Sequence, residues 1–132
     1  MTGLVLDASV AAIAVSESGP GGDSVRDRLV GAVLHAPHLI DAEVGSVLRK
    51  TVAARLMPPD QATGALRTLG RLVSERYAHG PLSLAAWDLR HHLPFYDALY
   101  VVLAARLGLP LITADVRLAH APRLPCRVEI IR

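Results

Sequence analysis

Short apolar runs alternate with longer helical segments along this chain, and this alternation constrains the fold more than any other feature. The expected strands lie in residues 4–7, 38–40, 79–84, 110–113 and 127–132. The expected helices cover residues 8–18, 23–34, 41–56, 60–77 and 87–92, and a last one follows Pro94 and ends at Gly108. Strands that alternate with helices favour a parallel sheet with helices on both faces. We therefore predict a three-layer α/β/α sandwich with a central, mainly parallel sheet, formed by a single domain over residues 1–132.

The composition favours a folded protein of the cytoplasm. Hydrophobic residues make up 52% of the 132 residues and charged residues 20%, which is enough apolar material for a core without disulfides. Cys126 is the only cysteine, so an internal disulfide and a cysteine-only zinc site are excluded. The longest uncharged apolar run, 98–105, is far shorter than the roughly 20 residues that span a bilayer. The N-terminal stretch lacks the basic region of a signal peptide, and Asp7 interrupts its apolar residues.

The segment FYDALYVVLAARLG, residues 95–108, predicts a helix buried between the sheet and its neighbours. Gly108 suits the left-handed residue that ends many helices. Asp97 is the one carboxylate at the entrance of this apolar run. Taken alone, Asp97 has a structural explanation, because carboxylates stabilise the first turn of a helix.

Four acidic residues fall where a parallel α/β sheet binds ligands. Asp7 and Asp115 follow predicted strands, and Glu43 and Asp97 stand near the starts of predicted helices. Ligands bind at the carboxyl ends of the strands in such sheets, so we expect the four side chains at one edge. Each of them alone could be a helix-terminal or turn residue. Together they would repel one another unless a cation lay between them, and oxygen-only ligands select Mg²⁺ or Mn²⁺.

The charge balance favours a nucleic-acid substrate. The chain has 14 basic and 12 acidic residues, so without the four acids of the site the rest of the molecule carries about +6. An acidic metal pocket within a basic surface suits the hydrolysis of phosphodiesters. The candidates for phosphate contact are Arg49, Arg55, Arg90 and Arg117, although any one of them could be an ordinary surface charge.

Four pieces of the sequence occur together in an order and spacing known from one family. They are LVLDASV (4–10), DAEVGSVLRK (41–50), FYDALYVVLAARLGLPLIT (95–113) and TADVRL (113–118). With these pieces the chain resembles the PIN domains, and most of all the small toxin ribonucleases of the VapC type. The resemblance extends over the whole chain from Leu4 to Ile131.

The resemblance implies a metal-dependent endoribonuclease that hydrolyses RNA phosphodiesters with a metal-activated water. The acidic quartet of the family falls on Asp7, Glu43, Asp97 and Asp115. The three aspartates would hold Mg²⁺, or Mn²⁺ as the alternative, and Glu43 would ligate a second ion or position the attacking water. Ser9 and Thr113 match hydroxyl residues that support the acids.

The resemblance also implies partners. They are an RNA substrate, a cognate antitoxin that blocks the site, and further copies of the chain in a homodimer or a toxin–antitoxin hetero-oligomer, with no membrane involved. A fifth acid is absent beside the last motif, because Val116 and Arg117 follow Asp115. One metal ion is therefore the safer expectation. The apolar stripe of the helix expected over 23–34 is a candidate partner groove, with ordinary core packing as the alternative.

Three other interpretations compete with the nuclease. A phosphoryl-accepting receiver domain needs a lysine at a strand end, but Lys50, the only lysine, falls inside a predicted helix. A phosphatase with a nucleophilic aspartate would place an acid two residues after it, where this chain has Ser9. The remaining alternative is a catalytically inactive PIN module that binds RNA or a protein. Asp41 lies two residues before Glu43, off the face that carries it, and is interpreted as a helix cap.

Overall fold

The computed structural model describes residues 2–131, and its centre is a sheet of parallel strands. The strands are β1 (Gly3–Leu6), β2 (Val33–Pro37), β3 (Glu75–Tyr77), β4 (Leu111–Thr113) and β5 (Val128–Ile130). Their order in the sheet is β3-β2-β1-β4-β5, and every neighbouring pair is parallel. Val5 of the central strand aligns with His35 on one side and with Leu111 on the other. The predicted parallel sheet is confirmed.

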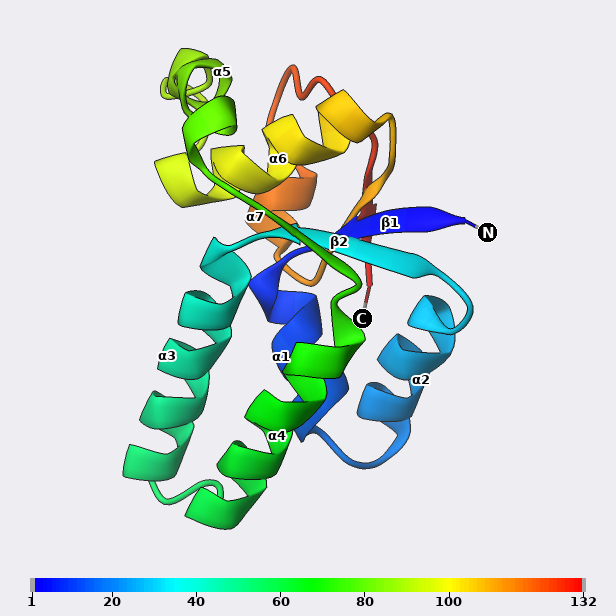
Figure 1. Cartoon of the computed structure of the whole chain (residues 1–132), viewed down its shortest axis with the longest axis vertical. Helices are drawn as coiled ribbons and strands as arrows, with labels where there is room; N and C mark the ends of the chain where they lie inside the picture. Colours follow the sequence, from blue (N-terminus) through cyan, green and yellow to red (C-terminus); the bar gives the residue numbers. More distant parts are fainter. Residues whose placement is uncertain (1, 132) are drawn as a thin grey trace.

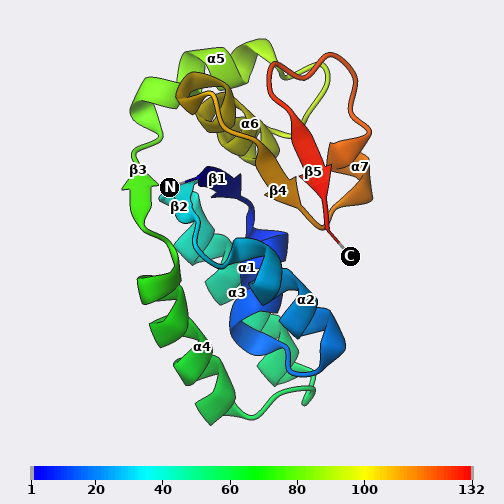
Figure 2. The same ribbon diagram turned by 90° about the vertical axis from the view of Figure 1, so that its right-hand side faces the viewer.

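Helices cover both faces of this sheet. They are α1 (Ala8–Ser16), α2 (Pro20–Leu29), α3 (Leu39–Ala53), α4 (Pro59–Leu72), the short 3-10 helix η1 (Gly80–Leu82), α5 (Ser83–Asp88), α6 (Phe95–Leu107) and α7 (Val116–Ala119). Figures 1 and 2 show α1 to α4 gathered on one side of the sheet and α5 and α6 on the other. The three-layer α/β/α sandwich is therefore confirmed. No helix within residues 2–131 is both long and apolar enough to cross a bilayer.

The core is densest where α6 lies against β1, β2 and β4. Every residue of α6 from Ala98 to Ala104 is buried, which explains why this run needs no polar face. Gly108 ends the helix in the left-handed conformation, with φ of 66°, as predicted. The N-terminal end of this fixed helix, with Asp97, therefore has a well-defined position.

Two boundaries in the first half differ from the prediction. The helix expected over 23–34 starts earlier, at Pro20, and ends at Leu29, because Gly31 turns the chain with φ of 77°. The strand expected at 38–40 is wrong. The strand here is β2, which ends at Pro37, and residues 38–40 already form the entry to α3. The N–H of His38 donates to the carbonyl of Tyr77, which is the last hydrogen bond from this segment to β3.

Two further differences concern the middle of the chain. The helix expected over 60–77 ends at Leu72, and its last residues form the edge strand β3, which pairs with β2. The strand expected within 79–84 is wrong, because this segment forms η1 and the start of α5. The helix expected over 87–92 is in fact the earlier α5, which ends at Asp88. The last strand is confirmed as β5, although residue 132 of its expected span lies outside the described residues.

Candidate active site

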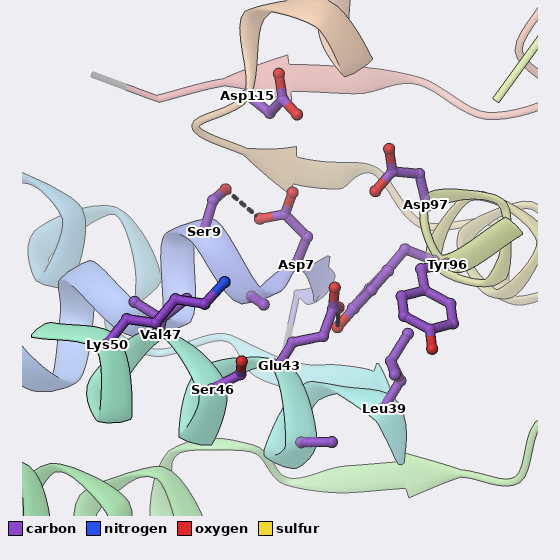
Figure 3. Close-up of a pocket in the computed structure, with 13 residues that line it drawn as sticks. Asp7, Ser9, Leu39, Glu43, Ser46, Val47, Lys50, Tyr96, Asp97 and Asp115 are labelled. Atoms are coloured by element: carbon purple, nitrogen blue, oxygen red, sulfur yellow. Dashed lines mark hydrogen bonds between the residues drawn. The ribbon is translucent and has the colours of Figure 1, made fainter. Parts of the chain in front are cut away.

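All four predicted acids line one pocket at the carboxyl edge of the sheet. Its volume is about 530 Å³, and it opens beside the ends of β1 and β4, which lie where the strand order reverses. Figure 3 shows Asp7, Asp97 and Asp115 pointing toward a common space, with Glu43 approaching from α3. The expectation that strand ends and helix starts bring these residues together is therefore met by the geometry.

Asp7 is the most firmly held of the four acids. It follows β1 and caps α1, since its Oδ1 accepts a hydrogen bond from the Val10 N–H at 3.2 Å. The Ser9 hydroxyl donates to the same oxygen at 2.6 Å, and the Thr113 hydroxyl donates to Oδ2 at 2.5 Å. Burial raises the pKa of Asp7 above its ordinary value, and the bonds from Ser9, Thr113 and Val10 oppose that rise.

Ser9 and Thr113 also tie the end of β1 to the end of β4. The Ala114 N–H donates to the Ser9 hydroxyl at 3.0 Å, and the Asp115 N–H donates to the Thr113 hydroxyl at 3.0 Å. Each hydroxyl thus accepts from the loop after β4 while it donates to Asp7. This geometry supports the predicted role of both residues in orienting the acids, which stays a prediction.

Asp97 is the least satisfied acid. It lies in the first turn of α6, and its carboxylate receives no hydrogen bond within residues 2–131. Burial raises its pKa to about 6, and the negative charges of Asp115, Asp7 and Glu43 add to that rise. The positive charge of Arg117 only partly opposes this rise, so Asp97 is a carboxylate among three other acids, which fits a bound cation better than a purely structural role.

Asp115 and Glu43 are fixed from different sides. Asp115 caps α7, with its Oδ1 accepting from the Arg117 N–H at 2.9 Å. Glu43 lies in the second turn of α3, and its Oε1 accepts a hydrogen bond of 2.7 Å from the Tyr100 hydroxyl. Burial raises the pKa of Glu43, the bond from Tyr100 opposes the rise, and the charge of Asp7 adds to it.

The donor set fits a hard divalent ion, although the side chains do not form a finished site. Within residues 2–131, no three His, Cys, Asp or Glu side chains are arranged to hold one metal ion. Carboxylate oxygens are nevertheless the ligands that Mg²⁺ and Mn²⁺ prefer, and the mutual repulsion at Asp97 is what such an ion relieves. The predicted metal role of the quartet stays a prediction.

Of the four arginines predicted to contact phosphate, only Arg117 lies close to the acids. Arg117 lies beside the site, with its Nε 3.7 Å from Asp115 Oδ1. Arg90 lies over the ring of Trp87, 4.8 Å from its centroid, and Arg55 follows the end of α3. None of Arg49, Arg55 and Arg90 lines the acidic pocket.

Among the pocket residues that sequence reasoning missed, Lys50 and Tyr100 bear most on its chemistry. Lys50 lines the pocket, and Figure 3 shows its amino group directed toward the side where Ser9 lies. Its position seven residues after Glu43 on one helix was the available signal, since two turns return to the same face. For Tyr100 the signal was its spacing of three residues from Asp97.

One secondary prediction about helices is wrong, and one pair of alternatives is decided. Asp41 does not cap α3, whose N-cap residue is His38, because its carboxylate is bound by the Arg76 guanidinium at 2.7 and 2.9 Å. For the stripe of the 23–34 segment, the alternative of ordinary core packing is confirmed. Val25 and Leu29 are buried in the core, whereas the exposed Val30 already lies beyond α2.

Comparisons with known proteins agree on one family. The family model described as PIN domain matches residues 4–124. Ribonuclease VapC1 of Mycobacterium tuberculosis is 43% identical over 129 residues, which is 97% of this chain and 97% of that protein. Ribonuclease VapC9 of the same organism is 34% identical, over 97% of this chain and 98% of its own length. The solved structure of VapBC2 from Rickettsia felis bound to a promoter DNA fragment is 12% identical with a TM-score of 0.72, and covers 99% of this chain and 100% of that chain, which shows a shared fold.

Proposed function

Because this chain belongs to the PIN-domain family and is similar over nearly its whole length to VapC ribonucleases, we propose that it is a metal-dependent endoribonuclease, the toxin of a toxin–antitoxin pair. The observation that carries the proposal is the convergence of four carboxylates on one pocket, with the pKa of Asp97 raised to about 6 by burial and by its acidic neighbours. A pocket of this kind gathers cations and, through them, phosphate groups.

The quartet supplies the ligands. The residues that would hold Mg²⁺, or Mn²⁺ as the alternative, are Asp7, Asp97 and Asp115, and Glu43 would ligate a second ion or position the attacking water. When bound, such an ion lowers the pKa of water and neutralises charge on the phosphate. Ser9 and Thr113 keep Asp7 in one orientation through their hydrogen bonds. The products of hydrolysis are a phosphate end on one RNA fragment and a hydroxyl end on the other.

RNA binding is assigned to basic side chains around the acids. Lys50 lines the pocket and Arg117 Nε lies 3.7 Å from Asp115, which supports a role for both in contacting RNA phosphates near the acids. Arg49, Arg55 and Arg90 lie farther out and could contact only more distant nucleotides. The RNA sequence that is cleaved would be found by mapping cleavage ends across cellular RNA after brief expression.

The nuclease proposal is tested by incubating the purified chain with mixed RNA in Mg²⁺, in Mn²⁺ and in a chelator. We expect cleavage with either ion, none with the chelator, and a loss of about 100-fold or more in the variant Asp97→Asn. Cleavage that persists in Asp97→Asn would contradict the proposal. RNA binding without cleavage in any ion would instead support the catalytically inactive module.

An antitoxin partner is supported by apolar side chains next to the pocket. A hollow between α1 and the α3–α4 pair has Val47, Leu56 and Met57 among polar side chains such as Glu17 and Gln61, and Val47 also lines the acidic pocket. Leu56 is 80% and Val47 45% exposed, so the hollow presents more than one apolar side chain to solvent, and adjoining exposed apolar side chains mark interaction surfaces. A polypeptide lying in this hollow would therefore reach the active site.

The partner proposal is tested by expressing the chain with the product of the adjacent gene. We expect the two to copurify and RNA cleavage to be suppressed, with the stoichiometry given by light scattering. Leu56→Glu should weaken copurification and leave cleavage by the free chain unchanged, because Leu56 does not line the acidic pocket. Equal copurification of this variant would contradict the assignment of the hollow.

A further inference from the structure

Tyr100 is a buried aromatic residue whose hydroxyl group has one partner. Its side chain is 1% exposed, and it lines the acidic pocket from α6. The hydroxyl donates to Glu43 Oε1 at 2.7 Å, and this is its only hydrogen bond within residues 2–131. The bond connects α6 on one side of the sheet to α3 on the other.

Because of this bond, the two carboxylate oxygens of Glu43 have different surroundings. Oε1 is occupied by the phenol, whereas Oε2 has no donor within the described residues. A glutamate side chain has several rotatable bonds and loses entropy when it is fixed. Tyr100 provides the fixed point, because its neighbours Leu99 and Val101 are buried and its ring cannot move without disturbing the core.

We propose that Tyr100 is a positioning residue that holds Glu43 by Oε1 and leaves Oε2 as the single oxygen facing the attacking water. The inference rests on the proposed nuclease function and deepens it. It assigns Glu43 to the water, while Asp7, Asp97 and Asp115 remain the ligands of the ion. A carboxylate with one oxygen already bonded to a phenol is a poor bidentate ligand.

The chemical step is then a hydrolysis in which atoms balance. The water oxygen forms a bond to phosphorus, and its proton passes to Oε2 of Glu43. The bond from phosphorus to the leaving oxygen breaks, and solvent protonates that oxygen. Tyr100 keeps its own proton throughout, because burial and the neighbouring Glu43 raise its pKa far above the ordinary value.

The test compares Tyr100→Phe with Tyr77→Phe. Each variant removes one phenolic hydroxyl and one hydrogen bond, but the Tyr77 hydroxyl is bonded to His35 at 2.8 Å, away from the acidic pocket. For Tyr100→Phe we expect kcat to fall about tenfold, because a general base loses efficiency when it is misplaced. KM for RNA and the dissociation constant of Mn²⁺, measured by titration calorimetry, should stay within about twofold. Tyr77→Phe should keep the wild-type kcat.

A double variant separates positioning from a structural role. If Tyr100 acts through Glu43, adding Tyr100→Phe to Glu43→Gln should cost no further activity. Unchanged kcat in Tyr100→Phe, a matching loss of Mn²⁺ affinity, or full additivity in the double variant overturns the inference while the nuclease proposal stands. A wild-type chain that does not cleave RNA overturns the proposed function and the role of Tyr100 with it.

Discussion

The two sides of the acidic pocket differ in how their carboxylates are held. The Asp7 half consists of Asp7, Ser9 and Thr113, and the Asp97 half is the first turn of α6. Both oxygens of Asp7 accept hydrogen bonds, and the residue is 7% exposed. Asp97 receives no hydrogen bond within residues 2–131, and its pKa is raised to about 6 by burial and by three neighbouring acids. Asp7 is therefore part of the folded framework, whereas Asp97 remains unsatisfied until something positive binds.

The fold explains why Asp97 cannot move away from the other acids to relieve their repulsion. Asp97 stands on the first turn of α6, and the seven residues after it, Ala98 to Ala104, are all buried. Tilting the helix to separate the acids would disturb the densest part of the core. The repulsion therefore remains at the site and is expressed as a raised pKa, which is a common property of functional sites.

The largest effect on stability is expected from Asp7→Ala. The change removes the cap of α1 and leaves the hydroxyls of Ser9 and Thr113 without their acceptor. We expect the free energy of unfolding to fall by about 3 kcal/mol, measured by urea denaturation. Asp97→Ala serves as the control and should not destabilise the metal-free protein. Equal destabilisation by both changes would remove the distinction between the halves.

A somewhat smaller effect is expected from metal binding to the wild-type protein. At a Mn²⁺ concentration about 100 times the dissociation constant, the free energy of unfolding should rise by about 2.7 kcal/mol. Asp97→Asn should lose most of this gain, because it removes the acid that the other three repel most. The measurement is the shift of Tm with Mn²⁺ at pH 7. A full shift in the variant would show that Asp97 is not a ligand.

The sequence allowed the Asp7 half to be predicted well, because position alone determines it. An acid directly after a buried strand must lie at the carboxyl edge of a parallel sheet, and a serine two residues later falls on the same turn. Asp97 was also placed correctly, since the apolar run behind it had to form a buried helix.

Contacts between distant segments could not be predicted in this way. The bond from Tyr100 to Glu43 joins residues 57 positions apart, and nothing in either local sequence indicates it. Edge strand β3 was missed for the same reason. Its residues, ERY, continue a helical pattern, and only pairing with β2 makes them a strand. Residues 33 and 34 were assigned to the end of a helix, and Ala36 and Pro37 were interpreted as a break after it rather than as the end of strand β2.

Lys50 allows a test of which half holds the substrate. It is the one basic residue that lines the acidic pocket among residues 2–131, and its amino group is directed toward the Ser9 side. Lys50→Met should raise KM for RNA about tenfold and reduce the salt dependence of binding, because one phosphate contact is lost. Arg67→Met removes one charge from an exposed position on α4 and is the matched control. An equal change in KM for both variants would show that Lys50 contributes only to the overall positive charge and makes no specific phosphate contact.

The smallest effect, an increase in stability, is expected from Asp97→Asn in the metal-free protein. The folded-state pKa of about 6 lies above the ordinary value of 3.8, so the folded protein binds more protons than the unfolded chain between these pH values. The stability associated with Asp97 is thus fully present below about pH 4 and is lost as the pH rises through 6. At pH 7 the neutral amide should raise the free energy of unfolding by about 1 kcal/mol, less than the pKa shift alone implies, since solvent screens this partly exposed carboxylate. Urea denaturation from pH 4 to pH 8 should therefore show a decline in the wild type that is reduced in the variant. A decline of equal size in both would place the strain at Asp7 or Glu43, whose pKa values are also raised, and would reverse the contrast between the two halves.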